Sequence, residues 1–168
     1  MYRNILAPID GSAPSSRAFS VALQLARDTG AQLQPLYAVD VPLMSYDVPG
    51  YDPSYVRDAL FEEGQHVIDD ALARMKSAGV SGTPRILEVS PLDGDIAEHI
   101  LKAANELPAD LVVMGTHGRR GVRRLVLGSV AERFLRLAHS PVLMVPAHGE
   151  QEIAVQSGTA PETAGEPS

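Results

Sequence analysis

An apolar run followed by glycines, a histidine and a serine is the part of this sequence best suited to chemistry. Residues 111–114 are continuously apolar, as in a strand buried on both faces. Gly115 and Gly118 follow the run, and Gly128 and Ser129 then open a helical pattern. Glycines after a strand provide a positive φ or let a ligand approach the backbone. Because a helix N-terminus adds unpaired N–H groups and a positive dipole end, this order predicts a phosphate site.

A second turn with a chemical side chain is Asp10-Gly11-Ser12, which leaves an apolar stretch near the start of the chain. An ionised carboxylate is an acceptor only, so Asp10 suits a ribose hydroxyl or a Mg²⁺ ion beside phosphates. The structural alternative is a turn or helix cap over Ser12.

Ser129 also has two readings. Its hydroxyl can donate a hydrogen bond to a phosphate oxygen, whereas Ser129 and Glu132 together form a capping-box pattern. The two roles can coexist.

Strand and helix patterns alternate along the chain, which predicts a parallel sheet covered on both faces. The predicted strands cover residues 3–10, 33–39, 85–89, 111–114 and 142–145. The predicted helices cover residues 14–28, about 54–77, 96–107 and a segment that starts at 129. Residues 40–55 contain several prolines and no steady period, so we expect a long loop, and such loops often serve as lids or binding loops.

The expected fold is a single Rossmann-like α/β domain with an open five-stranded sheet in the order 3-2-1-4-5. In such sheets a ligand lies beyond the carboxyl ends of the strands, where the strand order reverses. The first and fourth strands are then central neighbours. We therefore expect the Asp10 turn and the loop from Gly115 to Gly118 to meet, although about a hundred residues separate them.

Composition limits the function classes further. The 168 residues carry a net charge of −7, which argues against a general affinity for nucleic acid, and they include no cysteine for disulfides or thiolate metal sites. The chain has no apolar run of about 18 residues, as a membrane span requires, and no room for a signal peptide before the first strand. We expect a cytoplasmic protein with a folded domain over residues 1–146 and a disordered tail over 147–168.

The motifs resemble the nucleotide-binding signature of the ATP-binding branch of the universal stress protein family. The resemblance rests on the spacing of Gly115, Gly118 and Gly128-Ser129, and extends to residues 5–12 and 140–146. It implies the same sheet order and a bound ATP with Mg²⁺, the metal held tentatively by Asp10. The implied nucleotide-binding residues are Pro8, Asp10, Val39, Val41, Met114, Gly115, His117, Gly118, Gly128, Ser129 and Val130.

Within this implied site, Pro8, Val39 and Val41 lie at strand ends and would form an apolar slot for adenine. His117 stands between two glycines and could contact a phosphate. Four arginines of the same loop suggest neutralisation of a triphosphate, and a solvated loop is the alternative for each of them. These arginines are Arg119, Arg120, Arg123 and Arg124.

The resemblance implies a nucleotide-responsive regulatory module of the stress response. Slow ATP hydrolysis or autophosphorylation is the most turnover we expect, because only Asp10 or His117 could act as a base. One alternative is a nucleotide hydrolase or transferase that acts at the α-phosphate. Another is an interaction protein of the family's non-ATP branch, which the intact glycines and Ser129 disfavour. The resemblance also implies a homodimer through the edge strand formed by Val142, Leu143, Met144 and Val145.

Overall fold

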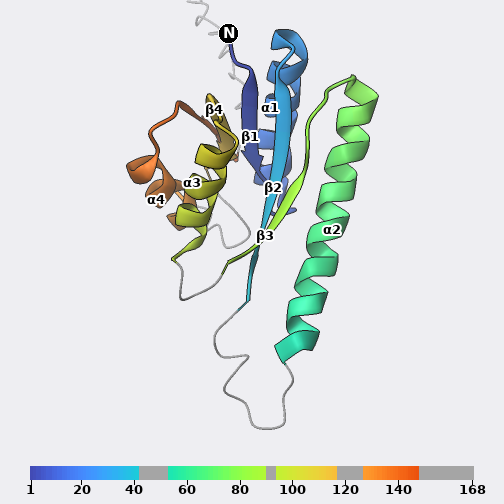
Figure 1. Ribbon diagram of the computed structural model, residues 1–168, viewed down its shortest axis with the longest axis vertical. Helices are drawn as coiled ribbons and strands as arrows, with labels where there is room; N and C mark the ends of the chain where they lie inside the picture. Colours follow the sequence, from blue (N-terminus) through green and yellow to red (C-terminus); the bar gives the residue numbers. More distant parts are fainter. Residues whose placement is uncertain (42–52, 90–93, 117–126, 148–168) are drawn as a thin grey trace, which may run out of the picture.

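A computed structural model describes residues 1–41, 53–89, 94–116 and 127–147, and every structural statement below concerns these ranges (Figure 1). Five parallel strands form one sheet in the order β3-β2-β1-β4-β5, which confirms the predicted topology. The strands are β1 (Asn4–Pro8), β2 (Gln32–Asp40), β3 (Arg85–Val89), β4 (Leu111–Gly115) and β5 (Val142–Val145). The helices are α1 (Ala13–Thr29), α2 (Pro53–Ala78), α3 (Ile96–Glu106) and α4 (Ser129–Leu137).

Three predicted features lie outside the described residues. These are most of the loop over 40–55, the loop that carries His117, Gly118 and the four arginines, and the tail beyond Ala147.

Helices cover both faces of the sheet, with α1 and α2 on one face and α3 and α4 on the other (Figure 1). Because successive strand residues point to opposite faces, each strand feeds two cores. Ile5 and Val113 are buried with Phe19 of α1 in one core. Leu6 and Val112 are buried with other apolar residues in the second core, beneath α3 and α4.

Helix α1 illustrates how the sequence sets these elements. Ser12 is its N-cap and accepts a hydrogen bond from the Ser15 N–H, and Gly30 ends it in the left-handed conformation at φ 71°. Its buried stripe includes Phe19 and Ala22, which pack against the sheet. Full burial of a side chain such as Phe19 stabilises the fold by about 1.5–3 kcal/mol.

The two central strands are tied together at their amino ends and separate at their carboxyl ends. The Asp110 carboxylate, just before β4, accepts hydrogen bonds from the backbone N–H groups of Arg3 and Asn4. Pairing between β1 and β4 ends at Leu6 and Val112, while β1 pairs with β2 as far as Pro8. This divergence opens the edge of the sheet at which the site residues were predicted.

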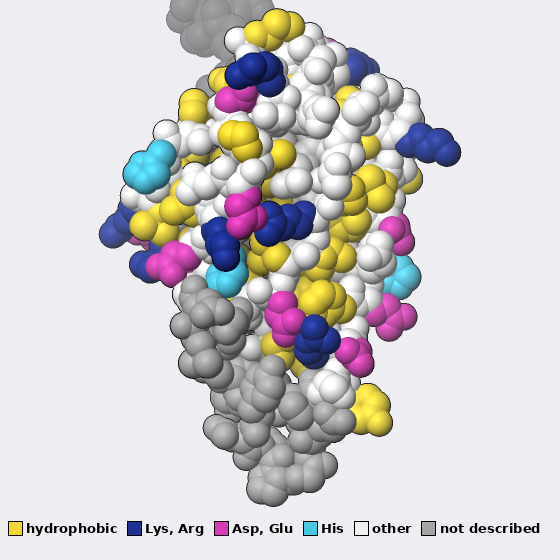
Figure 2. Space-filling view, viewed as in Figure 1, with side chains coloured by type: hydrophobic (Ala, Val, Ile, Leu, Met, Phe, Trp, Pro, Cys, Tyr) yellow, Lys and Arg dark blue, Asp and Glu magenta, His cyan; other side chains and the backbone are white. Residues whose placement is uncertain are grey.

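Charged side chains of both signs lie close to one another on the face seen in Figure 2. At the outer edge of the sheet, Arg57 of α2 holds the Glu88 carboxylate of β3 through two nitrogens, and the shortest contact is 2.8 Å. Hydrogen bonding to this guanidinium lowers the pKa of Glu88. None of the helices in the described ranges is long and apolar enough to cross a membrane.

Candidate functional site

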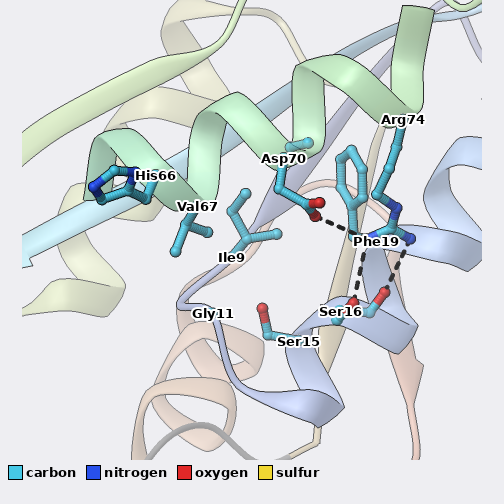
Figure 3. Close-up of a pocket in the computed structure, with 10 residues that line it drawn as sticks. Ile9, Gly11, Ser15, Ser16, Phe19, His66, Val67, Asp70 and Arg74 are labelled. Carbon is cyan, nitrogen blue, oxygen red and sulfur yellow. Dashed lines mark hydrogen bonds and ion pairs between the residues drawn. The ribbon is translucent and has the colours of Figure 1, made fainter. Parts of the chain in front are cut away.

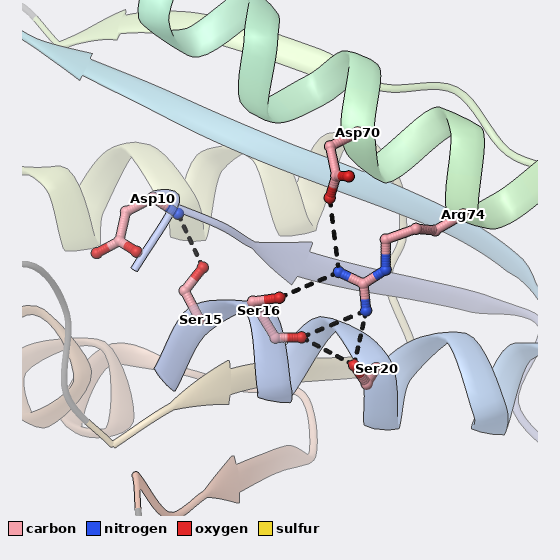
Figure 4. A network of polar contacts seen from close by, with 6 residues as sticks. All are labelled: Asp10, Ser15, Ser16, Ser20, Asp70 and Arg74. Atoms are coloured by element: carbon pink, nitrogen blue, oxygen red, sulfur yellow. Dashed lines mark hydrogen bonds and ion pairs between the residues drawn. The ribbon is translucent and has the colours of Figure 1, made fainter. Parts of the chain in front are cut away.

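The turn after β1 holds Asp10 in a small hydrogen-bond network (Figure 4). Its Oδ1 accepts from the Ser12 N–H at 2.9 Å and from the Ser12 hydroxyl at 2.6 Å. Its backbone N–H donates to Ser15 Oγ at 3.0 Å. The structural alternative for Asp10, a turn over Ser12, is therefore present.

Gly11 lets this turn close against α2. Its φ is +80°, and a Cβ added there would lie 3.0 Å from Val67 Cγ2. Both the backbone conformation and the contact therefore favour glycine.

The end of β4 and the start of α4 are joined directly. The Gly128 N–H donates to the Thr116 carbonyl at 2.7 Å, so the residue after β4 and the residue before α4 are in contact. Because β1 and β4 are parallel neighbours, with Ile5 level with Leu111, the carboxyl ends of both strands, followed by Asp10 and Thr116, point to the same edge of the sheet. The Asp10 turn and the N-terminus of α4 therefore lie at the same edge of the sheet.

The first turn of α4 has no side-chain cap. Its N-cap is Gly128, and Ser129 is the first helical residue, so the interpretation of Ser129 as a capping-box N-cap is wrong. The N–H groups of Ser129, Val130 and Ala131 have no acceptor among the described residues. In contrast, the first turns of α1 and α3 are capped by the side chains of Ser12 and Asp95.

Gly128 does not need glycine for its backbone. Its φ of −60° and ψ of 146° suit any residue. The lack of a side chain matters instead for space next to the uncapped helix end. An anion could approach these N–H groups closely there.

An ion-pair cluster fixes α4 against α3. Arg133 contacts Glu98 at 2.5 Å and also forms an ion pair with Asp95, the N-cap of α3. These interactions, first of all the hydrogen bond with Glu98, raise the pKa of Arg133. These contacts with α3 therefore orient the α4 N-terminus without a bound ligand.

The remaining predicted residues fall in different places. Pro8 is half-buried at the end of β1, Met114 is buried on the α3 and α4 face, and Gly115 is half-buried in β4 opposite Val145. Val39 and Val41 are 1% and 2% exposed in the core beneath α1 and α2. Their side chains thus pack inside the protein, so Val39 and Val41 could offer only backbone atoms to a ligand. His117 and Gly118 lie outside the described residues.

Ser15 was not singled out in the sequence. It lies on the buried stripe of α1 with Ala18, Phe19 and Ala22. The sequence did carry a signal, because Ser15 is a polar residue at a position where the helical spacing of α1 predicts an apolar one.

A hollow of about 280 Å³ lies between α1 and α2, on the side of the sheet away from α4, and its lining includes Gly11 of the Asp10 turn and Ser15 (Figure 3). Phe19 and Val67 line it, and Arg74 closes one end. The Arg74 guanidinium lies 4.8 Å from the Phe19 ring and is bonded to Ser16 and Ser20. Because the Arg74 guanidinium already donates hydrogen bonds to these serines, it has few donors left for an anion in the hollow. No group of three or more potential metal ligands occurs among the described residues.

Known proteins resemble this chain along most of its length. The model of a family described as the universal stress protein family matches residues 1–146. A universal stress protein of Methanocaldococcus jannaschii is 36% identical over 146 residues, which are 86% of this chain and 82% of that protein.

Solved structures agree with this match. A crystal structure of a protein from the universal stress protein family from Burkholderia pseudomallei is 49% identical and has a TM-score of 0.73, covering 86% of this chain and 96% of the other. A universal stress protein crystallised in complex with cAMP is 26% identical and has a TM-score of 0.57, covering 86% of this chain and 97% of the other.

Proposed function

This chain belongs to the universal stress protein family, and we propose that it binds an adenine nucleotide, ATP with Mg²⁺, between the Asp10 turn and the N-terminus of α4. It would act as a nucleotide-responsive regulatory module of the stress response in the cytoplasm. For the compartment, the support is family membership alone. The observation that carries the proposal is the hydrogen bond from Gly128 to Thr116, which holds an uncapped helix end at the carboxyl edge of the sheet.

The phosphates would bind at α4. The N–H groups of Ser129, Val130 and Ala131 lack acceptors among the described residues, and the positive end of the helix dipole adds to them. The Ser129 side chain is exposed and does not cap the helix, so its hydroxyl is available to donate to a phosphate oxygen. Gly128 leaves space for this approach.

The adenine and the triphosphate parts of the proposal have one support each. The structurally similar universal stress protein crystallised with cAMP holds an adenine nucleotide, and this chain shares 26% identity with it. The four arginines between 119 and 124 favour a triphosphate over a monophosphate, because several cations close together in the sequence would neutralise its charge.

Asp10 would face the ribose or the metal ion. Mg²⁺ in nucleotide sites commonly takes one or two carboxylates, with phosphate oxygens and water completing its shell. One carboxylate at the edge of the sheet fits that pattern. When bound, the ion would neutralise phosphate charge, while Ser12 keeps the Asp10 carboxylate in a fixed orientation.

We propose at most slow ATP hydrolysis or autophosphorylation. A fast hydrolase needs a base that orients the attacking water. Among the described residues at this edge, Asp10 is the candidate base, and its Oδ1 already accepts two hydrogen bonds from Ser12.

The proposed assembly is a homodimer through β5. This strand pairs with β4 and forms one edge of the sheet. Its Leu143 is 37% exposed, and Val142, Met144 and Val145 are half-buried. An apolar edge strand invites pairing with a second strand, and a second copy of the same strand would satisfy it symmetrically.

Native mass spectrometry of the purified protein tests the choice of ligand. We expect a co-purified mass that matches an adenine nucleotide and that is released on denaturation. Protein that carries no such mass and takes none up from added ATP and Mg²⁺ would contradict the proposal.

A further inference from the structure

We propose that Ser15 is a positioning residue that holds the Asp10 turn in the shape required for nucleotide binding. The inference rests on the proposed function, and it assigns to the site a residue that need not touch the nucleotide. Ser15 would act through Asp10, by holding its backbone N–H directly and its carboxylate by way of Ser12.

The first step of the argument is where the chain leaves the sheet. The Ile9 N–H still donates to the Leu36 carbonyl of β2 at 2.8 Å. The next N–H, that of Asp10, donates to Ser15 Oγ at 3.0 Å. Ser15 therefore takes the hydrogen bond that a neighbouring strand would otherwise accept, and it fixes the direction in which the turn departs.

The second step links Ser15 to the carboxylate. The Ser15 N–H donates to Ser12 Oγ at 3.3 Å, and the same hydroxyl donates to Asp10 Oδ1 at 2.6 Å. Asp10, Ser12 and Ser15 thus form a closed network that holds both the backbone and the side chain of Asp10 at the start of α1. Figure 4 shows the bond from the Asp10 N–H to Ser15.

The third step is the anchoring of α1 itself. Arg74 of α2 contacts Ser16 Oγ at 3.2 Å and Ser20 Oγ at 2.6 Å (Figure 4). It also lies over the Phe19 ring (Figure 3). Arg74 of α2 therefore fixes the start of α1 without a bound ligand. Ser15 reaches the Asp10 turn from a rigid support, as preorganised binding sites require.

Packing alone does not explain a serine at position 15. Ser15 is 5% exposed, and among the described residues it is the polar residue that is buried. Its neighbours on the same stripe include Ala18 and Ala22, and alanine is the better helix former. A buried hydroxyl is unfavourable unless it is hydrogen-bonded, so the bond to Asp10 is the gain that serine provides here.

The test measures the affinity for ATP with Mg²⁺ by calorimetry in Ser15→Ala, with Ser77→Ala of α2 as the matched control. Both changes remove a serine hydroxyl from a helix, but the Ser77 hydroxyl donates to the Ala73 carbonyl of its own helix rather than holding the Asp10 turn. We expect Ser15→Ala to weaken binding about tenfold and Ser77→Ala less than about twofold. Ser15→Thr keeps the acceptor, so we expect it to stay within about threefold of the wild type.

A double-mutant cycle separates positioning from general stability. In an Asp10→Ala background, adding Ser15→Ala should change the affinity by less than about twofold, because the two residues act as one unit. Thermal melts monitor the stability of each variant alongside.

The outcomes are distinct. If the wild type binds the nucleotide and Ser15→Ala binds it with the same affinity, the positioning role is overturned and the proposed nucleotide site still stands. A tenfold loss that persists in the Asp10→Ala background also overturns it, because Ser15 would then act independently of Asp10. Failure of the wild type to bind any adenine nucleotide overturns the proposed function itself.

Discussion

The backbone N–H of Gly128 donates a 2.7 Å hydrogen bond to the carbonyl of Thr116, and this contact joins the end of β4 to the start of α4. The strand and the helix are not consecutive in the sequence, yet they meet at one edge of the sheet. Asp10 lies at the same edge, because β1 and β4 are parallel neighbours. The proposed nucleotide site depends on this junction.

Removing the Asp10 carboxylate should weaken nucleotide binding. We expect Asp10→Ala to lower the affinity for ATP with Mg²⁺ about ten- to hundredfold, which corresponds to the loss of one hydrogen bond to a charged group. Calorimetric titration measures this.

Asp110→Ala is its matched control. Asp110 accepts hydrogen bonds from Arg3 and Asn4 at the opposite ends of the same strands. It should lower stability without changing affinity. Equal losses of affinity in the two variants would contradict a specific role for Asp10.

Gly11→Ala should destabilise the fold by about 1–2 kcal/mol from the left-handed backbone, plus a further amount from the contact with Val67. Gly30→Ala is the comparison, since Gly30 has φ 71° but nothing within 4 Å of an added Cβ. Urea denaturation measures both variants. If Gly11→Ala is no more destabilising than Gly30→Ala, the Val67 contact does not constrain the turn.

The ion pair at the outer edge of the sheet should make stability depend on pH. The pKa of Glu88 is lowered in the folded protein, so the stabilisation is present above the unfolded pKa, about 4.3, and is lost as the pH falls through the folded value. Since the pair is exposed, we expect Glu88→Gln to cost about 0.5 kcal/mol at pH 7.

At pH 3 the difference between the wild type and Glu88→Gln should be smaller, because the protonated carboxyl resembles the amide. Urea denaturation at the two pH values compares them. A difference that is as large in acid as at neutral pH would rule out the ion pair as its cause.

A charge on the β5 edge should disrupt the proposed homodimer. We expect Leu143→Lys to be monomeric by light scattering at micromolar concentration, where the wild type is dimeric. Leu135 of α4 is similarly exposed, at 40% against 37%, so Leu135→Lys should remain dimeric. A wild-type mass near 17.9 kDa, or a dimeric Leu143→Lys, would count against pairing through β5.

Much of the fold follows from local sequence patterns. The bounds of β3 and β5 agree with prediction because each is a short, mostly apolar segment between turn residues. The cap of α4 was mispredicted because Ser129 and Glu132 fit a capping box locally. The tertiary hydrogen bond from Gly128 to Thr116 places the helix start instead.

The site was less predictable from sequence. The alternation of side chains along β2 sends Val39 into the core beneath α1 and α2, which the resemblance alone did not reveal. The bond from Asp10 to Ser15 depends on how α1 follows its turn, and no motif encodes it.

The most direct test of the nucleotide site is a calorimetric titration of the wild type and Gly128→Val with ATP and Mg²⁺. The backbone at Gly128 suits valine, so the variant should fold with nearly unchanged stability while its side chain occupies the space before the α4 N–H groups. We predict that the wild type binds and that the affinity of a folded Gly128→Val falls at least about tenfold. Equal affinity in the two folded proteins would contradict phosphate binding at the N-terminus of α4.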